Sequence, residues 1–108
     1  MTFPFRPRVK QRPRLGRRGK AYTPAETKQF EQRIRNAWDF PPIDGPVNVE
    51  VHLYKDKFRV VVKQFDGPLK SSLRGDIDNY AKAILDGLNR VAYTDDSKIR
   101  RLYIYKYE

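Results

Sequence analysis

The segment from Val47 to Val62 alternates between apolar and polar side chains, and this alternation constrains the fold more than any other feature of the sequence. Every second residue from Val47 to Leu53 is apolar, and the same period returns from Phe58 to Val62. A period of two places the apolar side chains on one face of a strand. Because the polar triplet at 55–57 is typical of a turn, the pattern predicts a β-hairpin of two antiparallel, half-buried strands.

Helical periodicity flanks this hairpin on both sides. Thr23, Pro24 and Glu26 are typical of a helix start, since threonine can cap, proline fits the first helical position and glutamate completes a capping box. Apolar residues then recur at helical spacing until two consecutive prolines at 41–42, which predicts a helix over about residues 24–38. A second apolar series from Ile77 to Val91 predicts a helix over about residues 78–89.

A last strand is predicted after the polar turn at 94–97, because Leu102 and Ile104 alternate with more polar neighbours. We therefore expect an α/β (α+β) fold in which two helices pack a small mixed sheet that contains the hairpin and this C-terminal strand. The length of 108 residues suits one small domain. We expect that domain over residues 21–108, preceded by a basic arm over residues 1–20.

The charge distribution points to a polyanionic partner. Lys and Arg total 23 against 13 Asp and Glu, a formal net charge of +10. The first 20 residues contain no acidic residue and include eight basic ones: Arg6, Arg8, Lys10, Arg12, Arg14, Arg17, Arg18 and Lys20. Three prolines break any long helix there, so the arm is expected to be extended or partly disordered when free. Such an arm favours nucleic acid, because its binding to phosphates releases counterions.

Several classes of protein are excluded by composition. The chain has no cysteine, so disulfides and thiolate metal sites are ruled out, which is compatible with a reducing cytosol. It has no run of about 18 apolar residues and no apolar signal-peptide core near Met1, so we expect no membrane partner. A cytoplasmic location is the expectation that follows.

Two pairs of carboxylates define the candidate site. Asp76 and Asp78 are two residues apart, and on an extended chain their side chains point to the same side, about 7 Å apart. The start of the following helix would ease their repulsion through its dipole. The link that follows the helix is long enough to return Asp95 or Asp96 to this pair. The length of the link therefore permits a cluster of these carboxylates but does not require one.

A carboxylate cluster of this kind suits Mg²⁺, with Mn²⁺ as a substitute, because these cations prefer oxygen ligands. Such an ion can activate water and stabilise the charge that develops on a phosphodiester. Lys82 follows Asp78 by one helical turn on the same face and can hold the scissile phosphate. Asp86 is one turn further and is assigned a supporting role.

Simpler interpretations of the same residues stay open at this point. Asp78 can be only a helix cap, and the pair at 95–96 only a turn. Lys82 with Asp78 and Asp86 can be an ordinary ladder of charges four residues apart. From the residues alone the prediction is a basic nucleic-acid-binding α/β domain, and a non-catalytic binding module is an alternative to a metal-dependent enzyme.

The stretch "GDIDNYAKAILDGLN" followed by "YTDDSKI" closely resembles the RusA-type Holliday junction resolvases, which are crossover junction endodeoxyribonucleases. The shared signature is Asp-x-Asp-Asn, a Lys four residues after the second Asp, Asp-Ala/Gly-Leu, and then Asp-Asp-x-x-Ile/Val. The N-terminal "RPRLGRRGKAYTPAETKQFE" is similar to the basic arm and first helix of that family. The resemblance extends over about residues 12–106 and depends on the order and spacing of these pieces together.

The resemblance implies a homodimeric, Mg²⁺-dependent endonuclease that cuts four-way DNA junctions by paired nicks, with no small-molecule cofactor. It implies metal ligation by Asp76, Asp78 and Asp96, and a catalytic-site role for Lys82. Asp95 and Asn79 match supporting positions of the signature. A nucleoid-associated protein of phage or prophage type is compatible with this activity. A related nuclease that prefers flaps or forks is a further alternative.

Basic residues outside the carboxylate site are expected to grip the DNA backbone. They are Arg12, Arg14, Arg17, Arg18, Lys20, Lys63, Lys70 and Arg74. The chain departs from the family pattern directly before the first Asp, where Arg74 and Gly75 replace the more usual Lys-Pro. It also has only a reduced apolar strand, over residues 2–5, ahead of the basic arm.

Overall fold

The computed structural model describes residues 1–10, 14–15, 19, 21–22, 24–68 and 70–107. Within them the chain forms two compact units, Met1–Phe65 and Asp66–Glu108. The first contains β1 (Thr2–Phe3), β2 (Arg14–Leu15), β3 (Ala21–Tyr22), α1 (Ala25–Ala37), β4 (Val47–Leu53) and β5 (Phe58–Gln64). The second contains α2 (Ile77–Leu88) and the 3₁₀ turn η2 (Asp96–Lys98).

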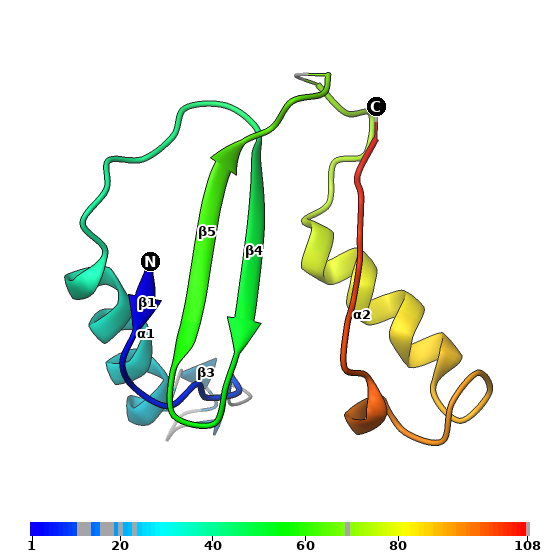
Figure 1. Cartoon of the computed structure of the whole chain (residues 1–108). Coiled ribbons are helices and arrows are strands. Elements are labelled where there is room, and N and C mark those ends of the chain that lie inside the picture. Colours follow the sequence, from blue (N-terminus) through cyan, green and yellow to red (C-terminus); the bar gives the residue numbers. More distant parts are fainter. Residues whose placement is uncertain (11–13, 16–18, 20, 23, 69, 108) are drawn as a thin grey trace. The chain divides into compact units, whose positions relative to one another are not determined.

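The predicted hairpin is confirmed and forms most of a three-stranded antiparallel sheet of order β1-β5-β4 (Figure 1). Its register pairs Val47 with Gln64 at one end and Leu53 with Phe58 at the other. β1 pairs with the opposite edge of β5, so the reduced strand at the chain start is part of the sheet. The α+β fold class is confirmed.

The core of the first unit is aromatic and lies between α1 and the strands β1 and β5. Phe3 is fully buried, and its ring stacks on that of Phe58 with 4.7 Å between centroids. Phe5 and Phe30 meet edge to face, and Trp38 stacks on Phe3. Aromatic rings bury large apolar areas, so this cluster accounts for the docking of α1.

The apolar face of β4 differs from the prediction. Its Val49, Val51 and Leu53 side chains are 60%, 51% and 69% exposed, so the expected half-buried strand is wrong for β4. The reason is positional, because β4 is an edge strand and the rings that fill the core come from β1, β5, α1 and their flanks. The burial expected for the second strand is correct at Phe58, which is buried.

The first helix begins and ends within one residue of its predicted limits. Pro24 occupies the N-cap position, and the amide of Trp38 closes the last turn on the carbonyl of Ile34 at 3.0 Å. Thr23, the predicted cap, is outside the described residues. The pairing of β2 with β3 was not predicted, because two-residue strands have no readable period.

The second unit is built around α2, and its predicted C-terminal strand is wrong. Arg90 adopts the left-handed backbone conformation (φ 66°), which reverses the chain after the helix. The described residues 99–107 form no strand ladder, and they run in an extended conformation near α2 (Figure 1). Alternation in the sequence specifies an extended segment but does not supply the backbone partner that a strand needs. Neither helix in the described part of the chain has the length and apolar content to cross a bilayer.

Candidate functional site

Asp76 occupies the N-cap position of α2, and its backbone begins the helix. Its conformation is extended (φ −70°, ψ 143°), and its carbonyl oxygen accepts from the amides of Asn79 and Tyr80 at 3.1 and 3.2 Å. Its carboxylate makes no capping hydrogen bond. The backbone therefore starts the helix while the exposed side chain is left available for a ligand.

Asp78 is in the first turn of α2, two residues after Asp76. The alternative in which Asp78 caps the helix is wrong, since Asp76 occupies that position. This is the arrangement that the sequence argument required, with one aspartate just before the helix and the other at its start. The positive end of the helix dipole is close to both carboxylates and reduces their mutual repulsion.

Asp95 is committed to the turn that precedes η2. Its carboxylate accepts from the backbone amide of Ser97 at 3.0 Å and also from the Ser97 hydroxyl. The hydroxyl bond first, and the amide bond second, hold the pKa of Asp95 below its ordinary value of 3.8. The turn interpretation is thus correct for Asp95, and it agrees with a supporting role for that residue.

Asp96 differs from its neighbour, because one of its oxygens is not committed. Its Oδ1 atom is buried and has no hydrogen-bond partner among the described residues. A buried acceptor without a partner costs roughly 1–3 kcal/mol, which a cation or a water can recover. This oxygen fits the chemistry of a ligand for a hard divalent ion.

Tyr93 links the Asp96 segment to the second half of α2. Its hydroxyl donates to the carbonyl of Leu85 at 3.1 Å. Burial, then the nearby Asp96 carboxylate, and then the charge of Asp86, raise the pKa of Tyr93 above its ordinary value of 10.0. Sequence reasoning missed Tyr93, although its place between the helix and the aspartate pair was a signal that could have found it.

The three predicted metal ligands are not gathered in one place. Asp96 interacts with Tyr93, which binds the second half of α2, whereas Asp76 and Asp78 are at its start. No group of three or more His, Asp or Glu side chains that could hold a metal ion occurs within the ranges that the structure describes. The ligation by all three residues therefore stays a prediction. The donor chemistry does fit Mg²⁺, which is commonly held by one or two carboxylates together with water and substrate phosphate.

Lys82 is exposed on α2 and, over the described residues, pairs with neither Asp78 nor Asp86. The interpretation of these three residues as an ordinary charge ladder is thus not supported by contacts. Asn79 and Asp86 are also exposed on this helix. The ammonium group of Lys82 is consequently accessible to a phosphate.

The predicted DNA-contacting residues are placed only in part. Lys63 is exposed on β5 in the first unit, and Lys70 and Arg74 are exposed in the second. Arg14 belongs to β2 through its backbone. The remaining four, Arg12, Arg17, Arg18 and Lys20, are outside the described residues.

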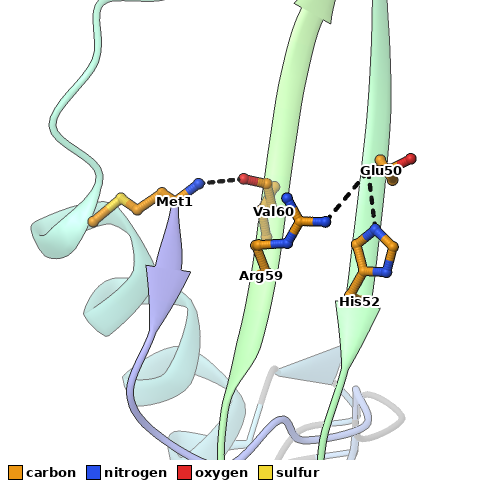
Figure 2. A network of polar contacts seen from close by, with 5 residues as sticks. All are labelled: Met1, Glu50, His52, Arg59 and Val60. Carbon is orange, nitrogen blue, oxygen red and sulfur yellow. Dashed lines mark hydrogen bonds and ion pairs between the residues drawn. The ribbon is translucent and has the colours of Figure 1, made fainter.

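A polar network crosses the β4–β5 pair of the first unit (Figure 2). Glu50 Oε2 is 2.9 Å from His52 Nε2 and 3.8 Å from Arg59 Nη2. The close approach of His52, first as a polar partner and then as a charge, holds the pKa of Glu50 below its ordinary value of 4.5. The single histidine is thus a partner of Glu50 on a strand surface.

Taken together, a basic α+β fold and an exposed carboxylate pair at a helix start are typical of small proteins that act on nucleic acid. The comparison with protein families gives the particular family: residues 4–108 match the model described as Endodeoxyribonuclease RusA. The chain therefore belongs to the RusA endodeoxyribonuclease family.

A relative in Bacillus subtilis (strain 168), named "Uncharacterized protein YqaN", is 33% identical over 104 residues. The match covers 84% of this chain and 73% of that protein. No solved structure matches the chain.

Proposed function

We propose that the protein is a Mg²⁺-dependent endodeoxyribonuclease that resolves four-way DNA junctions by paired, symmetric nicks. The observation that carries this proposal is the uncommitted carboxylate of Asp76 at the start of α2, in a chain that matches the RusA family over residues 4–108. A side chain that does not cap its own helix at a cap position is available for another ligand.

In the proposed mechanism Asp76 and Asp78 at the start of α2, together with Asp96, would hold the ion. A divalent cation held there would supply an activated water and would stabilise charge on the phosphodiester. Lys82 follows Asp78 by one turn of α2 and binds the non-bridging oxygens of the scissile phosphate as they gain charge. Asp95 keeps the neighbouring Asp96 in place through its bonds to Ser97.

Binding to DNA is assigned to the basic residues away from the carboxylates. Lys63, Lys70 and Arg74 are exposed cations, and the basic residues of the first 20 add to them. Each phosphate contact releases counterions, so we expect affinity to fall steeply with salt. A homodimer belongs to the proposal, because two symmetric cuts in a two-fold junction call for two sites related by a two-fold axis.

The test is cleavage of synthetic four-way junctions in Mg²⁺, compared with forks, flaps and linear duplex. We expect paired nicks in the junction, and loss of cleavage in Asp76→Asn and Asp78→Asn with DNA binding retained. Asp56→Asn is the matched control, since Asp56 is an exposed aspartate of the β4–β5 turn. Junction binding without cleavage by the wild type would support the non-catalytic module instead, and faster cutting of forks or flaps would support the related nuclease.

A further inference from the structure

The peptide that leads into Asp76 is held from two sides. The ammonium group of Lys106 donates to the carbonyl oxygen of Gly75 at 2.7 Å. The amide of the same glycine donates to the hydroxyl oxygen of Tyr80 at 3.1 Å. Both backbone groups of the residue before Asp76 are therefore engaged by side chains from elsewhere in the unit.

Lys106 reaches this peptide from a segment that is itself anchored. The hydroxyl of Ser71 donates to the carbonyl of Tyr107, and the amide of Leu73 donates to that hydroxyl. The end of the described chain thus runs beside the segment that precedes α2. Lys106 is only partly exposed, in keeping with its bond to the Gly75 carbonyl.

The fit around Gly75 is close. A Cβ atom at this position would be 2.8 Å from Cε2 and 3.0 Å from Cζ of Tyr80. The ring of Tyr80 would therefore have to shift to admit a side chain at this position, and glycine leaves the ring in place.

These contacts fix Asp76 through its backbone on both sides. The carbonyl of Asp76 starts α2 by accepting from Asn79 and Tyr80, while Lys106 holds the peptide on its other side. No described contact restrains the carboxylate itself. With its backbone fixed, the Asp76 side chain is confined to a few staggered rotamers about a Cα–Cβ bond of defined direction.

We propose that Lys106 is a positioning residue for Asp76: through the Gly75 carbonyl it holds the Asp76 backbone in the orientation that presents the carboxylate to a divalent cation. This inference rests on the proposed function for the role of Asp76 as a ligand. Lys106 acts through Gly75, and Tyr80 completes the hold. Removing a group that orients a metal ligand typically lowers the metal affinity by about 10–100-fold.

The experiment is calorimetric titration of the full chain with Mn²⁺, for the wild type, Lys106→Met, Lys106→Arg and Lys55→Met. We expect Lys106→Met to bind Mn²⁺ about 10-fold more weakly. Lys106→Arg should recover most of the affinity, since a guanidinium also donates to a carbonyl. Lys55→Met removes the same charge from an exposed turn and should bind as the wild type does.

A second measurement separates positioning from charge. The amide resonances of Gly75 and Asp76 should shift in Lys106→Met and stay in place in Lys55→Met. Tyr80→Phe, which keeps the ring and removes only the oxygen that accepts from Gly75, should also weaken Mn²⁺ binding, and it replaces Lys106→Met if that variant does not fold.

Wild-type Mn²⁺ affinity in both Lys106→Met and Tyr80→Phe would overturn the inference, as would a wild type that binds no Mn²⁺. A wild type that binds Mn²⁺ in a Lys106-dependent way but leaves junctions uncut would overturn the proposed function and support the positioning role.

Discussion

The hydroxyl of Tyr93 donates to the backbone carbonyl of Leu85 at 3.1 Å, and this bond ties the segment that carries Asp95 and Asp96 to α2. The parallel bridge between Asn89 and Tyr93 is next to it. Tyr93 thus holds the Asp95–Asp96 segment against the second half of α2, and its removal should be felt in stability.

Tyr93→Phe is expected to lower the midpoint of thermal unfolding by about 4 °C, since it removes one hydrogen bond and keeps the ring. The comparison is Tyr103→Phe, because Tyr103 is 70% exposed. Circular dichroism on heating measures both. Equal midpoints in the two variants would show that the Tyr93 hydroxyl does not hold the segment.

Asp96→Asn is expected to lower the pKa of Tyr93 toward 10.0, because the nearby carboxylate of Asp96 raises that pKa. Fewer protons are then held by Tyr93 at high pH. A ¹³C-labelled tyrosine titration followed by NMR from pH 8 to pH 12 measures it. Asp56→Asn is the control, and a Tyr93 titration unchanged by Asp96→Asn would contradict the contact.

The helices and the hairpin could be predicted from the sequence because each has a readable period. α1 and the β4–β5 hairpin are confirmed close to their predicted limits. The position of Asp76 just before α2 also followed from local pattern. These features are determined by residues that are close together in the sequence, so a single sequence is enough to predict them.

Features that depend on distant partners could not be predicted in the same way. The alternation at 102–104 predicted a strand. In the structure this segment instead contacts Gly75, 31 residues away in the chain, through the side chain of Lys106. The exposure of Val49 and Val51 follows from the edge position of β4, which no local pattern encodes. The distinct roles of Asp95 and Asp96 depend on Ser97 and Tyr93, so identical side chains in sequence have different surroundings in the fold.

Gly75→Ala and Gly87→Ala are expected to change stability in opposite directions. At Gly75 the new methyl group would be 2.8 Å from the Tyr80 ring, so the ring must shift and its bond to the Gly75 amide is strained. We expect a loss of about 1 kcal/mol. Gly87 in α2 has open space, and alanine there should add about 0.5–1 kcal/mol through helix propensity. Urea unfolding measures both, and a stabilised Gly75→Ala would contradict the close fit.

Acid sensitivity should be lowered by Glu50→Gln. The folded protein holds the pKa of Glu50 below 4.5, chiefly through His52, so folding releases a proton that the unfolded chain binds. The stability that Glu50 contributes is therefore fully present above about pH 4.5 and is lost as the pH falls through the lower folded value. Urea midpoints measured from pH 6 to pH 3 should fall less steeply in Glu50→Gln than in the wild type. Asp56→Gln removes an exposed carboxylate without a described partner and should keep the wild-type slope, and equal slopes in all three proteins would show that the network in Figure 2 does not contribute to stability.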